Sequence, residues 1–188
     1  MLKELVIKNR SVRRYDNGEK VSREVLRELV DSVRYCSNTG NRQRIRYITV
    51  TDEVLCAQIR EELGFAAYLK DWAGPAEDEC PTGYIVMLSE DDDRNLYIDL
   101  GIAAGTLTLL ARERGLGCCL FRSFDEKKLS KLLELRGYEP KLVLSLGIPD
   151  EKIELEAAKD GDIKYYRRED GTHVVPKLSL SEILLEQK

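Results

Sequence analysis

The sequence is poor in the residues on which most acid–base and metal chemistry depends. His173 is the only histidine among 188 residues. One imidazole cannot serve both as the base of a Ser-His-Asp triad and as a set of metal ligands. We therefore expect no catalytic triad and no metal site.

Paired cysteines are also lacking. The five cysteines are odd in number and contain no CxxC pair, which predicts a reducing, cytoplasmic location. Cys118 and Cys119 lie in an apolar run and are predicted to be small core residues, with a reactive thiol as the alternative.

A membrane-spanning run is absent as well. The longest apolar stretch, residues 98–111, contains Asp99 and is too short to cross a bilayer. The first ten residues, MLKELVIKNR, lack the apolar core and cleavage site of a secretory signal. We expect no contact with a membrane.

Positive charge is in deficit, since the net charge is −4 and the pI about 5.3. The whole chain offers no electrostatic basis for binding nucleic acid. Against this background the segment NRSVRRYD, residues 9–16, is strongly basic. Four of its residues could hold a phosphate, namely Arg10, Ser11, Arg13 and Arg14, with two guanidiniums and a hydroxyl converging on one dianion. The alternative is a solvated basic turn.

Three further segments carry candidate binding groups. SNTGNRQ, residues 37–43, offers amide donors and acceptors for a polar ring edge, or forms an ordinary loop. GLGCCLFRSFDEKKL, residues 115–129, predicts a glycine-rich strand entry followed by a helix N-terminus whose amides can face a ligand. It contains no GxGxxG dinucleotide fingerprint. Lys177 lies between a predicted strand and helix, where a solvated lysine is the simpler interpretation.

No repeat or linker interrupts the chain, so residues 1–188 are predicted to form a single α+β domain. Helices are predicted to start at Met1, after Ser22, over residues 53–68 and 96–114, and after Asp125; strands are predicted over residues 46–51, 84–89, 116–121 and 142–148. Residues 71–82 read as an irregular loop.

Two features favour an oligomer. The helix over residues 96–114 is apolar on nearly every side, which predicts that it is buried all round. The tail contains a short strand, residues 172–175, and a helix opened by a capping box of Ser179 and Glu182. This strand has no obvious neighbour in the sequence and could pair with its own sheet or with a partner's.

The order of these segments resembles the nitroreductase family of FMN-dependent oxidoreductases. The resemblance runs from about residue 5 to residue 185 and rests mainly on RSVRRYD, GIAAGTLTLLARERGLGCC and LVLSLGIP. It implies an α+β homodimer with a central, mainly antiparallel sheet flanked by helices. It also implies FMN at the subunit interface, and a C-terminal extension, residues 172–188, whose strand is exchanged with the partner.

The resemblance assigns cofactor contacts to ten positions. Arg10, Ser11 and Arg13 match the element that holds the FMN phosphate and ribityl chain. Asn38, Asn41 and Gln43 match a loop that lines the flavin, in part from the other subunit. Leu120, Arg122 and Ser123 match the segment against the flavin ring, and Lys177 matches a basic residue near the phosphate.

The sequence also departs from the family pattern. Arg44 and Ile45 stand where the family usually has Pro-Trp. Arg122 stands where glycine or glutamate is common, and Gly105 replaces a frequent glutamine. With these changes, the resemblance does not identify the substrate.

The function implied by the resemblance is transfer of electrons from NAD(P)H through noncovalent FMN to an electron-poor acceptor, of the nitroaromatic or quinone type, by ping-pong turnover. The flavin would carry the chemistry, so the shortage of histidine is no objection. The alternatives are a flavin-binding or flavin-sequestering protein with little turnover, or another FMN reaction such as dehalogenation, enoate-type reduction or flavin destruction.

Overall fold

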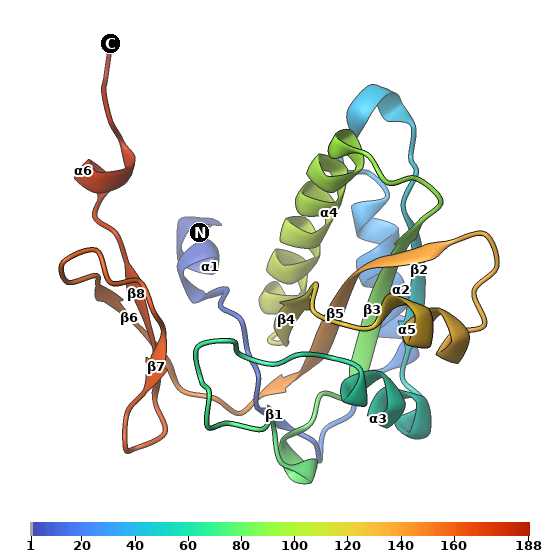
Figure 1. Ribbon diagram of the computed structural model, residues 1–188, viewed down its shortest axis with the longest axis horizontal. Helices are drawn as coiled ribbons and strands as arrows, with labels where there is room; N and C mark the ends of the chain where they lie inside the picture. The colour runs from blue at the N-terminus through green and yellow to red at the C-terminus, as the bar shows by residue number, and fades with distance from the viewer. Residues whose placement is uncertain (1) are drawn as a thin grey trace. The chain divides into compact units, whose positions relative to one another are not determined.

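A five-stranded antiparallel sheet forms the centre of the larger of two units in the chain (Figure 1). The computed structural model describes residues 2–188, so the predicted helix start at Met1 lies outside it. Unit 1 contains the described residues up to Phe65 together with Gly74–Asp150. Unit 2 contains Ala66–Ala73 and Glu151–Lys188.

Unit 1 alternates helices and strands. Its helices are α1 (Leu2–Lys8), α2 (Arg23–Val33), α3 (Glu53–Glu61), α4 (Arg94–Glu113) and α5 (Glu126–Leu132), with the 3₁₀ turns η1 (Thr39–Asn41) and η2 (Glu77–Glu79). Its strands are β1 (Tyr15–Asp16), β2 (Arg46–Val50), β3 (Gly83–Ser89), β4 (Gly117–Phe121) and β5 (Glu139–Pro149). The predicted α+β class is confirmed.

β5 is the central strand of the sheet. It pairs with β3 on one side, and with β4 and β1 on the other, while β2 pairs with the free edge of β3. Because successive strand residues point to opposite faces, β3 sends Ile85 and Met87 into one apolar cluster and Val86 and Leu88 into the other. Helices α2 and α4 cover the first cluster, and α3 and α5 cover the second.

The predicted helix over residues 53–68 is too long, because α3 ends at Glu61. Leu63 forms a β-bridge with Phe124, and the Gly64 N–H donates to the Ser123 carbonyl at 2.8 Å. A Cβ built on Gly64 would lie 2.6 Å from Ser123 Oγ. Tertiary pairing with the segment after β4 therefore ends the helix, although the apolar spacing continues to Leu63.

Helix α4 is not buried all round within the single chain, and its burial by a partner subunit stays a prediction. Leu100, Ala104 and Leu107 face the core. Ile98 is 53% exposed and Ile102 38% exposed on the opposite side. The face that these two isoleucines share is apolar and uncovered.

Unit 2 is built on a three-stranded sheet of β6 (Ile153–Ala157), β7 (Tyr166–Arg167) and β8 (His173–Lys177), and ends in α6 (Leu180–Ile183). The tail strand β8 pairs parallel with β6 and antiparallel with β7 of the same chain. Tyr165 contacts both Tyr68 and His173 through its ring, which attaches residues 66–73 to this unit. Exchange of β8 with a partner stays a prediction.

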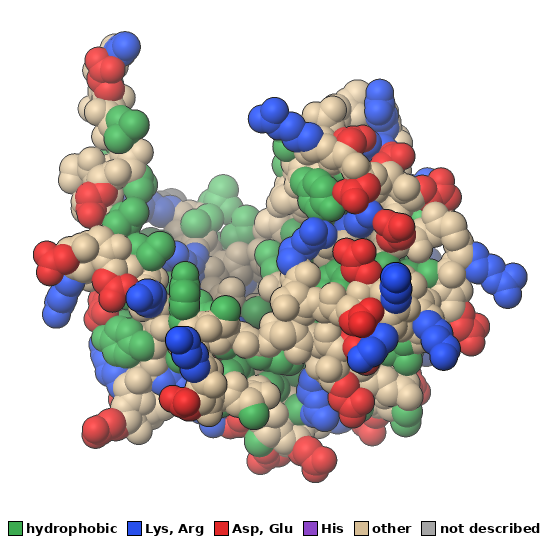
Figure 2. All heavy atoms as spheres, in the orientation of Figure 1, with side chains coloured by type: hydrophobic (Ala, Val, Ile, Leu, Met, Phe, Trp, Pro, Cys, Tyr) green, Lys and Arg blue, Asp and Glu red, His purple; other side chains and the backbone are tan. Residues whose placement is uncertain are grey.

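The surface shows two further properties. Basic and acidic side chains are interspersed on the face of unit 1 drawn in Figure 2, with neither sign gathered into a patch. The C-terminal segment of unit 2 exposes apolar side chains, including Leu180 at 69%, Ile183 at 64% and Leu185 at 94%. No helix within residues 2–188 is long and apolar enough to span a bilayer.

The two adjacent cysteines are core residues, as predicted. Cys118 and Cys119 are each 4% exposed on β4. Burial raises the pKa of Cys118 to about 12, with the neighbouring Cys119 adding to the effect. Cys118 is therefore a protonated thiol at neutral pH, and it is a poor candidate for a nucleophile.

Candidate cofactor-binding site

Strand β4 brings the basic N-terminal segment beside the segment that follows the strand. Ser11 forms a parallel bridge with Cys118, and the Val12 N–H donates to the Cys118 carbonyl at 2.8 Å. A Cβ built on Gly117 would lie 2.8 Å from Val12 Cβ. The glycine therefore allows residues 10–13 to run directly against the start of β4.

The arginines of this segment differ in their partners. Arg14 donates through Nε to Glu79 Oε1 at 2.7 Å and forms an ion pair with the same carboxylate. Arg10 donates through Nη2 to the Val6 carbonyl at 2.7 Å. Its Nε is buried and has no hydrogen-bond partner in the described part of the chain. Buried polar groups are usually paired, so Arg10 has donor capacity suited to an anion.

The far end of β4 presents an apolar side chain and a cation. Leu120 is 41% exposed, whereas the other residues of β4 are buried. Arg122 donates to the Lys141 carbonyl at 2.8 Å, and its guanidinium carbon lies 5.0 Å from the centre of the Tyr97 ring. The Ser123 carbonyl is taken by Gly64. Of these groups, Leu120 offers a surface on which a planar ring can pack.

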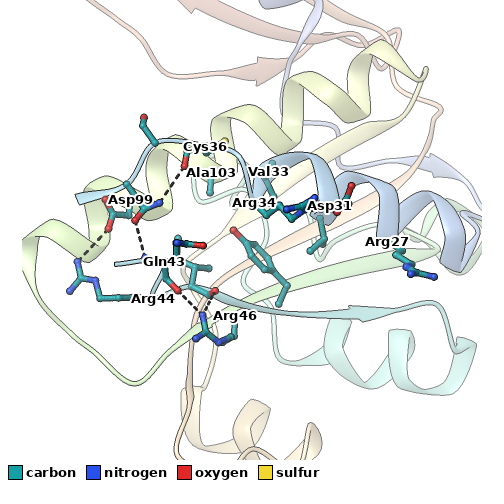
Figure 3. Close-up of a pocket in the computed structure, with 15 residues that line it drawn as sticks. Arg27, Asp31, Val33, Arg34, Cys36, Gln43, Arg44, Arg46, Asp99 and Ala103 are labelled. Carbon is teal, nitrogen blue, oxygen red and sulfur yellow. Dashed lines mark hydrogen bonds and ion pairs between the residues drawn. The ribbon is translucent and has the colours of Figure 1, made fainter. Parts of the chain in front are cut away.

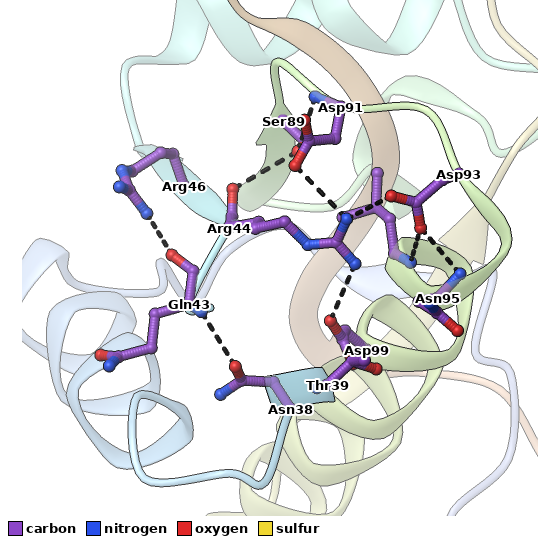
Figure 4. Close-up of polar contacts among 11 residues, drawn as sticks. Asn38, Thr39, Gln43, Arg44, Arg46, Ser89, Asp91, Asp93, Asn95 and Asp99 are labelled. Carbon is purple, nitrogen blue, oxygen red and sulfur yellow. Dashed lines mark hydrogen bonds and ion pairs between the residues drawn. The ribbon is translucent and has the colours of Figure 1, made fainter. Parts of the chain in front are cut away.

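The predicted amide loop folds onto itself around η1 (Figure 4). The Gln43 N–H donates to Asn38 Oδ1 at 2.9 Å. Gln43 Nε2 lies 3.3 Å from Asn41 Oδ1. Gly40, Asn41 and Gln43 have φ of 59°, 51° and 49°. Glycine and asparagine tolerate this left-handed region better than most residues. The hydrogen bonds and the backbone conformation of the loop together fix the positions of the Asn38, Asn41 and Gln43 side chains.

Arg44 joins this loop to the N-terminal part of α4 (Figure 4). Its side chain is 8% exposed and donates to Asp91 at 3.3 Å, to Asp93 and to Asp99 at 3.4 Å. Asp99 Oδ1 also accepts from the N–H and the hydroxyl of Thr39 at 2.8 and 2.9 Å. Burial alone would raise the pKa of Asp99, but the hydrogen bonds from Thr39 and Arg44 outweigh it and lower the pKa.

A cavity of about 380 Å³ lies beside the amide loop (Figure 3). Val30, Val33 and Ile45 contribute apolar wall, and Asn38 and Gln43 contribute amide groups. The basic residues Arg27 of α2, Arg34 directly after α2, and Arg46 of β2 also line it. The wall therefore combines apolar side chains with amide and charged groups, which can orient a small molecule.

The sequence model of the nitroreductase family matches residues 6–148. The chain belongs to the nitroreductase family. The family and the fold predicted from the order of the motifs are thereby confirmed.

Solved structures of similar fold carry related names. NfrA1 of B. megaterium has a TM-score of 0.68 at 21% identity, over 88% of this chain and 73% of that chain. An FMN-dependent nitroreductase of Clostridium difficile has a TM-score of 0.63 at 22% identity, over 84% and 92%. A nitroreductase family protein of Streptococcus pneumoniae has a TM-score of 0.69 at 14% identity, over 89% and 100%. At these identities the likeness shows the fold alone, and no curated protein sequence matches the chain significantly.

The structure places the predicted nitroreductase site residues in three groups. Arg10, Ser11 and Arg13 join Leu120, Arg122 and Ser123 along β4. Asn38, Asn41 and Gln43 form the amide loop, which contacts α4 rather than β4. Lys177 is exposed at the end of β8 in unit 2, opposite Ala157.

The departure from Pro-Trp after Gln43 has a structural counterpart. Arg44 replaces the proline and forms the ion pairs to α4, and Ile45 replaces the tryptophan in the wall of the cavity. The partners of Arg44 and the role of Thr39 were not predicted from the sequence. The sequence contained one sign of these contacts, because Asp99 is the only charged residue in an otherwise apolar helical run. Residues 2–188 contain no cluster of three metal-ligating side chains.

Proposed function

We propose that this nitroreductase family member is an FMN-dependent oxidoreductase that passes electrons from NAD(P)H to an electron-poor acceptor, of the nitroaromatic or quinone type, by ping-pong turnover. The observation that carries the proposal is the buried, unpartnered Arg10 Nε beside β4. It is the kind of donor that a phosphate group requires, and it lies within the family match.

Arg10, Ser11 and Arg13 would hold the FMN phosphate. Two guanidinium groups and a hydroxyl provide charge-assisted hydrogen bonds to a dianion, which are stronger than bonds between neutral groups. Arg14 is already engaged by Glu79 and is left out of the set. Lys177 belongs to unit 2, and its assignment to the phosphate stays a prediction.

The flavin ring would lie against Leu120 and the segment that includes Arg122 and Ser123. The exposed face of Leu120 would pack on the ring, and the charge of Arg122 would favour the anionic reduced form. Asn38, Asn41 and Gln43 would meet the polar ring edge, in part from the partner subunit. Bound FMN supplies the hydride and electron-transfer chemistry, and the protein side chains bind and orient it.

We propose a homodimer as the working form. The uncovered apolar face of α4, which contains Ile98 and Ile102, would pack on a second copy. The apolar side chains of the extension, residues 172–188, would likewise cover apolar surface of the partner. A cytoplasmic location stays a prediction.

The first test is an absorbance spectrum of the purified protein, followed by anaerobic addition of NADH or NADPH. We expect flavin bands that bleach with at least one donor and return on addition of a quinone or nitroaromatic. A protein that retains FMN but is not reduced by either donor would overturn the proposed turnover and favour flavin sequestration. A protein that takes up no FMN would overturn the cofactor assignment.

A further inference from the structure

A second cavity lies in unit 1 between α3, η2 and the start of β3. Its volume is about 240 Å³, and its wall includes Lys20, Arg60, Cys80 and Tyr84. None of the ten proposed cofactor contacts lines it. Pockets for drug-sized molecules measure roughly 300–1,000 Å³. This cavity therefore suits a more compact ligand.

Tyr84 places an unsatisfied polar group in this cavity wall. The residue is fully buried, and its hydroxyl oxygen has no hydrogen-bond partner in the described part of the chain. Burial, with the thiols of Cys56 and Cys80 adding to it, raises the pKa of Tyr84, so the phenol keeps its proton and can donate. Phenylalanine would fill the same apolar space without an unpaired hydroxyl.

Arg60 adds a cation with further donors. Its Nη1 donates to Cys80 Sγ, and the Cys80 thiol in turn donates to the Ala76 carbonyl at 2.9 Å. A guanidinium carries five N–H donors, and a thiol sulfur is a weak acceptor. Arg60 therefore has donors available for a stronger acceptor in the cavity.

The remaining charges of the wall leave the interior favourable for an anion. Lys20 lies 3.3 Å from Glu53, so these two opposite charges compensate each other at an exposed position. Glu77 also lines the cavity, and it is exposed. Arg60 disfavours a bound cation, and the convergence of a guanidinium with a phenol favours an oxygen acceptor that carries negative charge.

We propose that this cavity binds a small oxyanion, with Arg60 and Tyr84 as direct donors and Lys20 at its side. Two sources share this chemistry, namely an inorganic ion such as phosphate or sulfate, and the carboxylate of a small organic acid. The site is separate from the proposed flavin site.

The test uses the protein saturated with FMN, so that the proposed flavin phosphate site is filled. Sodium phosphate, sulfate and acetate are each titrated against sodium chloride of equal ionic strength, with the melting temperature and calorimetry as readouts. A ligand that binds only the folded state raises the melting temperature in a saturable way. We expect this rise with at least one oxyanion and not with chloride.

Two variants locate the binding. Tyr84→Phe removes only the hydroxyl, and we expect it to weaken the Kd of the oxyanion about tenfold. Arg60→Gln should weaken the Kd at least as much, whereas Arg23→Gln, at an exposed position of α2, should leave it unchanged. Arg10→Ala should also leave it unchanged, because Arg10 does not line the cavity.

The outcomes separate the sources. A response to phosphate and sulfate but not to acetate indicates an inorganic ion, and the reverse indicates an organic acid. No saturable response to any of the three overturns the proposal. Equal binding by wild type and Tyr84→Phe overturns it as well, because the ion then lies elsewhere; this comparison remains valid if Arg60→Gln does not fold.

Discussion

Asp99 on α4 accepts two hydrogen bonds from Thr39, a residue 60 positions earlier in the chain. The same carboxylate accepts from Arg44 at 3.4 Å. Thr39 within the amide loop and Arg44 directly after it are therefore attached to one buried carboxylate. The position of Asn38, Asn41 and Gln43 thus depends on a residue that does not belong to the loop.

We expect Asp99→Asn to destabilise the protein by about 1–3 kcal/mol, because it removes the charge from buried hydrogen bonds. The free energy of unfolding in urea measures the change. Asp31→Asn is the matched control, since Asp31 forms an exposed ion pair with Arg34 and should contribute less than about 1 kcal/mol. Equal effects of the two substitutions would contradict the role of Asp99.

Asp99→Asn should also change how the free energy of unfolding depends on pH. The pKa of Asp99 is lowered from its ordinary value of 3.8 in the folded protein, so its contribution to stability is present above that value. It is lost as pH falls through the lowered pKa. The free energy of unfolding of the wild type should therefore fall more steeply below about pH 4 than that of Asp99→Asn. Parallel curves down to acid unfolding would count against this linkage.

Arg10 and Arg14 are close in sequence but should differ in their effect on FMN. We expect Arg10→Ala to weaken FMN binding by tenfold or more, the effect of losing about 1.5–3 kcal/mol of charge-assisted hydrogen bonding. Arg14→Ala should leave the Kd of FMN nearly unchanged, because Glu79 already engages its guanidinium. Fluorescence titration of FMN gives both constants. If Arg14→Ala weakened FMN binding more than Arg10→Ala, the phosphate would have to lie elsewhere.

Gly117 and Val12 should be coupled. A methyl group at Gly117 would lie 2.8–2.9 Å from the Val12 side chain, so we expect Gly117→Ala to destabilise by about 1–3 kcal/mol. Val12→Ala makes room, and the double variant should be less destabilised than the sum of the single variants. Thermal or urea unfolding of the four proteins completes the cycle. Simple additivity would show that the contact is relieved in another way.

The uncovered face of α4 predicts the oligomeric state. If the proposed homodimer packs through this face, we expect Ile102→Glu to convert it into a monomer with weakened FMN retention, because the substitution places a charge in an apolar surface. Val54→Glu makes the same kind of change on α3, where the side chain is 68% exposed, and should leave the dimer intact. Light scattering after size exclusion measures the mass. A dimer that survives Ile102→Glu would require another interface.

Much of unit 1 could be predicted from local pattern. The strand expected over residues 84–89 is observed as Gly83–Ser89, because a continuous apolar run bounded by polar residues permits little else. α3 was overestimated because the pairing of Leu63 and Gly64 with residues 123–124 joins segments distant in sequence. β6 was missed although IELEA alternates in polarity, which is a strand signal.

Less of the candidate site could be predicted from local sequence patterns. The bridge between Ser11 and Cys118 depends on the pairing of two distant segments, and only the resemblance to a family brought them together in advance. The exposure of Ile98 and Ile102 could not be predicted from an apolar helix, since composition does not say whether the covering surface belongs to the same chain. Asp99 stood out as a charged residue in an apolar run, but nothing in the sequence identified Thr39 as its partner.

Trp72 is the only tryptophan of the chain, and it lies in unit 2 with the guanidinium carbon of Arg167 4.2 Å from its ring centre. Tryptophan emission is therefore a built-in optical reporter of the smaller unit. Far-ultraviolet circular dichroism is dominated instead by the longer helices and strands of unit 1. Where the two signals melt together, the units unfold as one cooperative body; where emission changes first, the C-terminal part opens while the main sheet persists.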